Sequence, residues 1–114
     1  MAKHVEELVP QIDELSLEVS RIVFARISHD HLDALRLKET ARLFNGPEPM
    51  LRVVWSANWS HGARTDIVIK LPERGALSHL ERTKRHLEHR LMREVFRIDA
   101  ELGAAEQLLG AVAA

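Results

Sequence analysis

Apolar residues recur every three or four positions along the last third of the chain, from Ser78 to about Gly110. This spacing places them on one side of an α-helix, and arginines and histidines fall on the opposite side. Ser78 and Glu81 have the spacing of a capping box, in which the hydroxyl and the carboxylate each bind a free backbone N–H group. We therefore predict a long amphipathic helix over residues 78–110. Its apolar stripe comprises Leu80, Leu87, Leu91, Val95, Ile98, Leu102, Ala105 and Leu109.

The first part of the chain, residues 1–44, also has helical spacing. Residues 4–27 carry apolar side chains at intervals of three and four. Pro10 fits only in the first turn of a helix, so the helix either begins near Val9 or follows a short turn. Residues 19–27 are rich in β-branched side chains, and a strand over this segment is the alternative to a helix.

A second helix is predicted from Ser28 to about Phe44. Ser28 is a suitable N-cap, and acidic residues follow in the first turn, where the helix dipole favours them. Apolar residues lie on two sides of this helix, which is typical of a helix packed between two partners. The sequence Asn-Gly-Pro-Glu-Pro over residues 45–49 then ends the helical part.

Residues 50–72 alternate between apolar and polar side chains, which is typical of β-strands. The loop Ser60-His61-Gly62 places glycine where a hairpin with a bulge needs a positive φ. The resulting register pairs Trp55 with Ile67, so that the apolar faces of the two strands coincide. The face that carries Trp55 and Trp59 must then be covered, most simply by the amphipathic helices.

These elements predict one α+β domain over residues 1–114, with the order α-α-β-β-α. It is a β-hairpin packed by amphipathic helices, with a long C-terminal helix. A two-stranded sheet is marginally stable and leaves two open edges. A further strand could come from residues 19–27 or from residues 76–83, or a second copy of the chain could supply the pairing. We therefore expect a homodimer or a higher oligomer.

Composition and charge limit the class of protein. The net charge is −1, and the chain has no cysteine, which excludes disulfides and thiolate chemistry. No apolar run reaches transmembrane length, and the N-terminus lacks the apolar core of a signal peptide. We expect a small soluble protein of the cytoplasm that needs no cofactor. Residues 1–18 are acidic and residues 73–97 are basic, so these two segments could attract each other.

The polar side of the predicted C-terminal helix is the first candidate site. Arginines at helical spacing suit contacts with successive phosphates or carboxylates, because each guanidinium binds an oxyanion through two hydrogen bonds. The alternative is a solvent-facing surface on which pairs such as Glu94–Arg97 balance the charge. The candidate anion- or RNA-binding residues are Arg82, Lys84, Arg85, Arg90, Arg93 and Arg97.

Histidines form the second candidate site. Clustered imidazoles can bind zinc, nickel or copper, with Glu88 or Asp30 as an oxygen ligand. The chain has none of the strict spacings of a metal-binding motif, and nearby arginines repel a cation. The alternative is therefore a set of surface histidines. The candidate metal ligands are His29, His31, His86 and His89.

Catalytic motifs are absent from the sequence. Ser-His occurs at residues 28–29, 60–61 and 78–79, but adjacency in sequence does not supply the geometry of a catalytic triad. The chain contains no GxSxG motif, no phosphate-binding loop and no GxGxxG motif. These absences disfavour an enzyme.

Several segments resemble the ribosome hibernation promoting factor and ribosome-associated inhibitor family, whose fold is β-α-β-β-β-α. Ile22–Ile27 is similar to its first strand, and Asp33-Ala34-Leu35-Arg36 is similar to the start of its first helix. Val53–Trp59 and Ile67–Leu71 resemble its central strands, and Lys84–Glu101 resembles its final basic helix. The resemblance implies binding to small-subunit ribosomal RNA through basic helix residues, which here are Arg82, Lys84, Arg85, Arg90 and Arg93.

The sequence thus predicts a non-catalytic interaction module that forms oligomers and presents a basic helix face to an acidic partner. Binding of RNA or the ribosome through the same face is the second hypothesis. A histidine-based transition-metal site or a small enzyme is the third.

Overall fold

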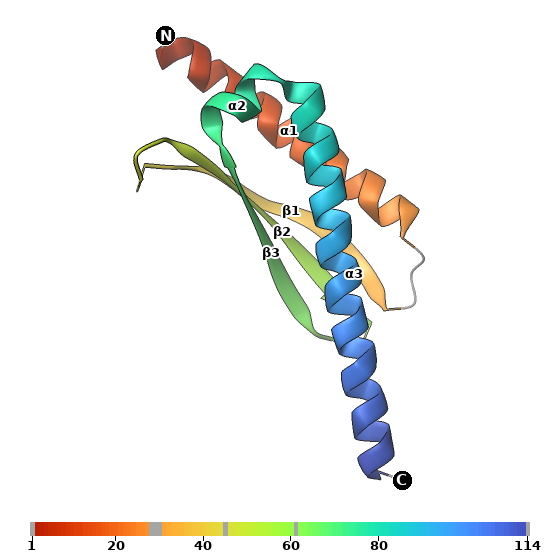
Figure 1. Cartoon of the computed structure of the whole chain (residues 1–114). Helices are drawn as coiled ribbons and strands as arrows, with labels where there is room; N and C mark the ends of the chain where they lie inside the picture. The colour runs from red at the N-terminus through yellow and green to blue at the C-terminus, as the bar shows by residue number, and fades with distance from the viewer. Residues whose placement is uncertain (1, 28–30, 45, 61, 114) are drawn as a thin grey trace.

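The computed structural model of the chain describes residues 2–27, 31–44, 46–60 and 62–113, with side chains between residues 10 and 105 of these ranges. Its elements are helix α1 (Ala2–Arg26), strands β1 (Leu32–Leu43), β2 (Met50–Trp59) and β3 (Arg64–Pro72), short helix α2 (Glu73–Ser78) and long helix α3 (Leu80–Ala113). The predicted α+β class and the long C-terminal helix are confirmed. The order is α-β-β-β-α, with α2 at the turn into α3 (Figure 1).

Within the described residues, three strands form one antiparallel sheet in the order β1-β2-β3. Helices α1 and α3 cover one face of this sheet and contact each other (Figure 1). The C-terminal turns of α3 extend past the end of the sheet, which makes the molecule elongated, at 63 × 29 × 19 Å. In the part of the chain that is described, no helix combines the length and apolar composition needed to cross a bilayer.

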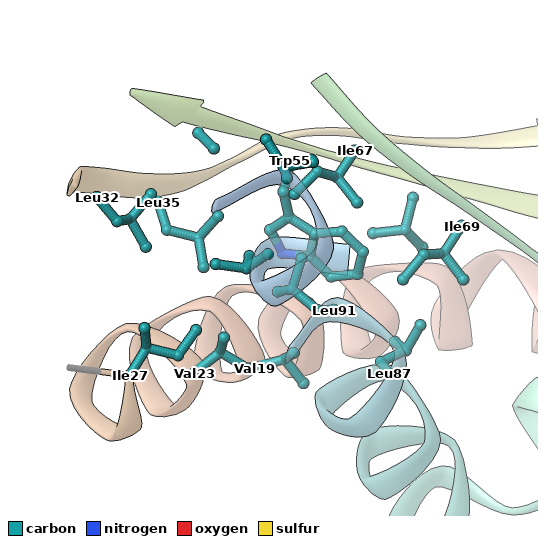
Figure 2. Packing of buried hydrophobic residues seen from close by; sticks show 14 of the residues in the cluster. Val19, Val23, Ile27, Leu32, Leu35, Trp55, Ile67, Ile69, Leu87 and Leu91 are labelled. Atoms are coloured by element: carbon teal, nitrogen blue, oxygen red, sulfur yellow. The ribbon is translucent and has the colours of Figure 1, made fainter. Parts of the chain in front are cut away.

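The core lies between the inner face of the sheet and the two long helices. Trp55 of β2 is fully buried, and its indole Nε1 donates a hydrogen bond to the Ser16 carbonyl oxygen of α1 at 3.2 Å. Val19 of α1 and Leu87 and Leu91 of α3 pack around it from the helix side (Figure 2). The prediction that amphipathic helices cover the tryptophan face is therefore confirmed.

The β2–β3 hairpin has the predicted register. Trp55 pairs with Ile67, and the flanking apolar pairs follow at intervals of two residues. At the turn, the Trp59 N–H donates a hydrogen bond to the Ala63 carbonyl oxygen at 2.9 Å. Gly62 has a φ of +89°, which glycine adopts at little cost because it has no Cβ.

The second predicted helix, residues 28–44, is wrong over its described part, which forms β1. The pairing of β1 with β2 shifts register after Leu32 and again after Leu37. Each shift inserts an extra residue, as in a β-bulge, so inward-facing side chains lie three residues apart instead of two. Leu32 and Leu35 are therefore both buried at a spacing that also fits a helix. The predicted N-cap Ser28 lies outside the described residues.

Strand β1 is the third strand that the hairpin needs. Residues 19–26 are helical, so the alternative strand in that segment is wrong, and residues 76–83 belong to α2 and the start of α3. Two segments on which the family resemblance depends also form a different secondary structure from the one that it implies. Ile22–Ile27 lies at the end of α1 and not in a strand, and Asp33–Arg36 lies in β1 and not in a helix.

Two predicted helix starts differ from the structure. Helix α1 is continuous from Ala2 and includes Pro10, where we expected a start near Val9 or a separate turn. Helix α3 begins at Leu80, because Ser78 ends α2 and its hydroxyl donates a hydrogen bond backwards to a carbonyl oxygen of that helix, at 2.6 Å. The predicted capping box is therefore wrong, although the predicted helix itself is present.

Candidate functional site

Helix α3 carries apolar and basic residues on opposite sides. Leu87, Leu91 and Val95 are buried against the sheet and α1, as the apolar stripe predicts. The opposite side points to solvent, and all of its arginines and histidines are exposed except Arg90, which is half-buried. We call this side the basic face. It comprises Arg82, Arg85, His86, His89, Arg90 and Arg93.

The arginines of the basic face have no ion-pair partner among the described residues. Glu81 and Arg85 have the i,i+4 spacing of an ion pair but form no salt bridge in the described structure. From Arg82 to Arg93 the basic face extends about 16 Å along the helix axis at a rise of about 1.5 Å per residue. Arg82, Arg85 and Arg93 are exposed and Arg90 is half-buried, so among the residues with described side chains these four guanidinium groups are not held by a carboxylate.

Two predicted anion-binding residues are instead used within the chain. Lys84 Nζ donates a hydrogen bond to Glu18 of α1 at 2.8 Å, and this bond raises the pKa of Lys84 above its ordinary value. Arg97 donates to Glu94 and to Glu101, both at 2.8 Å, and these carboxylates raise its pKa. The six predicted cations therefore divide into four free arginines and two paired residues.

The ion pair of Lys84 with Glu18 is a contact between the two segments of opposite charge, residues 73–97 and residues 1–18. It joins the basic segment to the acidic N-terminal segment within one chain. A longer contact, 3.9 Å between Arg26 and Glu88, joins the same two helices one turn further along α3. The attraction between the two segments thus helps to hold α1 beside α3.

An exposed aromatic residue extends the basic face toward the C-terminus. Phe96 has 53% of its surface exposed, although it lies on a helix whose opposite side is fully buried. It follows Arg93 by three residues, which places the two on the same side of the helix. We did not predict Phe96 as a site residue, yet its position on the polar side of the helical wheel is a signal that the sequence contains.

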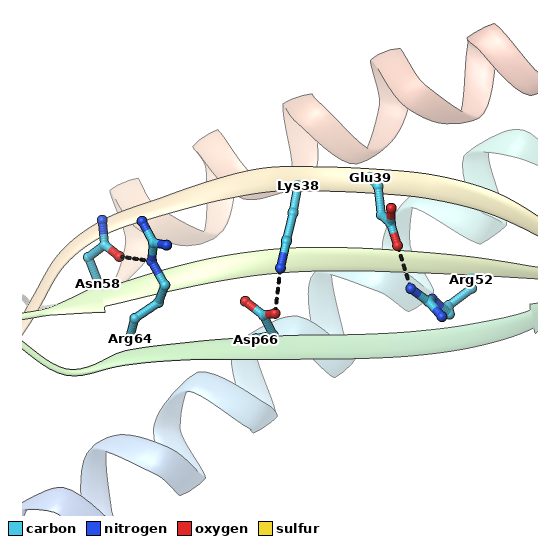
Figure 3. Close-up of polar contacts among 6 residues, drawn as sticks. All are labelled: Lys38, Glu39, Arg52, Asn58, Arg64 and Asp66. Carbon is cyan, nitrogen blue, oxygen red and sulfur yellow. Dashed lines mark hydrogen bonds and ion pairs between the residues drawn. The ribbon is translucent and has the colours of Figure 1, made fainter.

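The outer face of the sheet is a second cationic surface, on which part of the charge is paired with carboxylates (Figure 3). Lys38 of β1 reaches across β2 to Asp66 of β3, with 2.8 Å between Nζ and the carboxylate oxygen. Arg52 is paired with Glu39, and the Arg64 Nε donates to the Asn58 side-chain oxygen at 3.4 Å. Compared with the basic face, this surface offers fewer free cations to an external anion.

The four candidate metal ligands do not come together where they are described. His86 and His89 lie exposed on α3 near α2, whereas His31 lies beside the β2–β3 turn, at the other end of the sheet, where its carbonyl oxygen accepts the Ser60 N–H at 2.7 Å. His29 lies outside the described residues. Among the residues with described side chains, no three His, Asp or Glu groups are close enough to share a metal ion.

Comparisons with protein-family models, with curated proteins and with solved structures find no match to this chain. The geometry and charge of the basic face are therefore the observations from which a function can be inferred. The family resemblance remains a prediction.

Proposed function

We propose that this protein is a non-catalytic binding module that holds RNA on the basic face of α3. The observation that carries the proposal is a group of four arginines, Arg82, Arg85, Arg90 and Arg93, on the polar side of α3, none of which has an ion-pair partner among the described residues. Arginine binds phosphate oxygens bidentately, and several such contacts along a strand give a binding energy that does not depend on base sequence.

Two features favour RNA over an acidic protein as the partner. The arginines recur over about three turns of one side of α3, which suits contacts with several successive phosphates of a nucleic-acid backbone. Phe96 continues the same side of the helix and is exposed, so an unpaired base can stack on its ring beside a phosphate held by Arg93. An acidic protein surface would supply carboxylates but would make no use of an isolated exposed aromatic ring in this way.

The structure agrees with only part of the predicted family resemblance. The segments aligned with the family's central strands and final basic helix lie in β2, β3 and α3, whereas the residues that we aligned with its first strand and first helix occupy other elements. The resemblance therefore supports the proposal through the basic final helix. Binding to ribosomal RNA follows from it as the more specific form of the proposal.

We also propose that the chain self-associates. The original reason, a sheet of only two strands, no longer applies, but the outer edges of β1 and β3 have no strand partner among the described residues. Helix α3 also continues to Ala113, past the end of the sheet (Figure 1). Sedimentation equilibrium at tens of micromolar should give a mass of two or more chains, and a strict monomer would contradict this part of the proposal.

Fluorescence anisotropy tests the RNA proposal directly. The probe is a labelled single-stranded RNA of about 20 nucleotides, and the competitor is polyglutamate of equal charge. The variant Arg82→Gln/Arg85→Gln/Arg93→Gln should weaken RNA binding by about 30-fold, since three phosphate contacts are lost. The matched control Arg36→Gln/Arg64→Gln/Lys70→Gln removes the same charge from the outer face of the sheet and should weaken binding by about twofold at most.

The outcomes separate the hypotheses. Equal losses in the two variants would show a non-specific effect of net charge and would overturn the assignment to the basic face. Polyglutamate that displaces RNA at equal charge concentration would favour an acidic protein as the partner. No RNA binding by the unmodified protein at low salt would end the RNA proposal.

A further inference from the structure

A cavity of about 240 Å³ lies where β3, α2 and the start of α3 meet. Its walls are mostly apolar. Leu71 and Ala76 are buried beneath it, and Pro72 and Gly75 form its outer side. The remaining lining residues come from the start of α3 and the residue before it: His79, Arg82, Thr83 and His86.

The rim of the cavity carries the positive charge of Arg82, with a histidine on either side of it along the chain. His79, Arg82 and His86 follow one another at intervals of three and four, so they line one side of the opening. None of the residues that line the cavity is acidic, and Arg82 has no carboxylate partner in the described part of the chain. The rim therefore has a charge that nothing in the described structure balances.

The interior offers few polar groups to a ligand. Thr83 is the polar residue of the wall, and its hydroxyl lies 2.9 Å from the carbonyl oxygens of Ala76 and His79, where it donates within the protein. A ligand is therefore selected by the size of its apolar part and by the charge at its edge, and much less by a pattern of hydrogen bonds.

We propose that this cavity binds a small organic anion, with one ring or a short acyl chain inside and a phosphate or carboxylate at Arg82. An apolar cavity of about 150 Å³ accommodates benzene, so this one is large enough for a single substituted ring. A guanidinium binds the oxyanion bidentately, and the two histidines supply further N–H donors. This site lies at the N-terminal end of the basic face and shares Arg82 and His86 with it.

Gly75 lines the cavity at an exposed position of α2. A Cβ added at this position would have no heavy atom within 4 Å, and the backbone of Gly75 does not have a positive φ. Neither close packing nor backbone geometry therefore requires glycine in α2, where glycine is less favourable than alanine. A larger side chain at this lining position can be introduced without a clash, which provides a way to obstruct the cavity while Arg82 and both histidines stay in place.

Calorimetric titration with three probes tests the proposal. Phenyl phosphate should bind about tenfold more tightly than inorganic phosphate or phenol, because only it uses both the cavity and the rim. Gly75→Leu should weaken phenyl phosphate binding about tenfold, and Gly75→Ala should weaken it about threefold. Gly103→Leu is the matched control, because a side chain there also meets no atom within 4 Å, and it should change the affinity by less than about twofold. Arg82→Gln should weaken the binding of phenyl phosphate but not the binding of phenol.

Wild-type affinity in both Gly75 variants, or equal affinity for phenyl phosphate and inorganic phosphate, would overturn the cavity as a binding site. When phenyl phosphate binds as expected, its affinity is compared with that of benzoate. Tighter binding of benzoate would indicate a carboxylate ligand, and tighter binding of phenyl phosphate would indicate a phosphate ligand. Gly75→Leu leaves every arginine in place, so it should retain RNA binding. Failure of the cavity proposal is thereby distinguishable from failure of the RNA proposal, which Gly75 variants do not test.

Discussion

The two sides of α3 differ in how their side chains contact the rest of the chain. On the inner side, Leu87, Leu91 and Val95 are buried against the sheet and α1, and each contact contributes to the fold. On the outer side, arginines such as Arg82 and Arg93 have no partner among the described residues. Under the proposed function, the inner side of this helix supplies stability and the outer side supplies binding, so a change on one side need not alter the property of the other. This separation can be tested residue by residue.

The largest expected effect is on the inner side. Leu91→Ala removes a fully buried side chain and leaves a cavity, so the free energy of unfolding should fall by about 2–5 kcal/mol. Urea denaturation followed by tryptophan fluorescence measures this loss, since both tryptophans lie in the core. RNA affinity measured where the variant is folded should stay within about twofold of the wild type. A loss of affinity under those conditions would show that the two sides are coupled.

Phe96→Ala is the matched change on the outer side of the same helix. Phe96 is 53% exposed, so its removal should change the free energy of unfolding by less than about 0.5 kcal/mol. RNA affinity in the anisotropy assay should fall about fivefold, because a base loses its stacking partner. Unchanged affinity together with lower stability would place Phe96 in an intramolecular contact and would remove one reason for preferring RNA.

A smaller effect is expected at the border between the two sides, where Lys84 pairs with Glu18. The hydrogen bond raises the pKa of Lys84, so its contribution to stability is complete below the ordinary pKa of 10.5 and is lost as the pH rises above it. Glu18→Gln should therefore lower the melting temperature by about 1–2 °C at neutral pH. The difference from the wild type should shrink as the pH rises beyond 10.5 and through the raised pKa of Lys84, and a difference that does not depend on pH there would mean that the pair is not its cause.

The smallest effect is expected for Ser78→Ala. A true N-cap serine contributes about 1 kcal/mol, whereas Ser78 ends α2 and bonds backwards within that helix. Thermal denaturation should therefore show a change of less than about 0.5 kcal/mol. A loss of about 1 kcal/mol or more would indicate that the predicted capping box does form in solution.

The sequence predicts the elements whose side chains keep a regular period. The hairpin follows from strict alternation and from Gly62 at the turn, and the inner side of α3 follows from a stripe that repeats without interruption. Strand β1 could not be predicted in the same way, because its two register shifts replace the spacing of two with a spacing of three. Local periodicity does not distinguish a bulged strand from a helix when no partner strand is known.

The candidate site could be predicted in part. The basic residues of α3 are visible in the sequence, but which of them are free depends on tertiary neighbours. Lys84 meets Glu18 of α1, a residue 66 positions earlier in the chain. The cavity beside Gly75 depends on how α2 turns into α3, and it was therefore not visible in any local pattern.

The salt dependence of RNA binding tests the central claim most directly. The logarithm of the affinity is measured against the logarithm of the salt concentration for the wild type and for Arg82→Gln/Arg85→Gln/Arg93→Gln. If these arginines each neutralise one phosphate, the slope of the variant should be smaller than that of the wild type by about two to three. The sheet-face control, Arg36→Gln/Arg64→Gln/Lys70→Gln, should keep the wild-type slope. Equal slopes for the wild type and the α3 variant would contradict the claim that the basic face binds RNA.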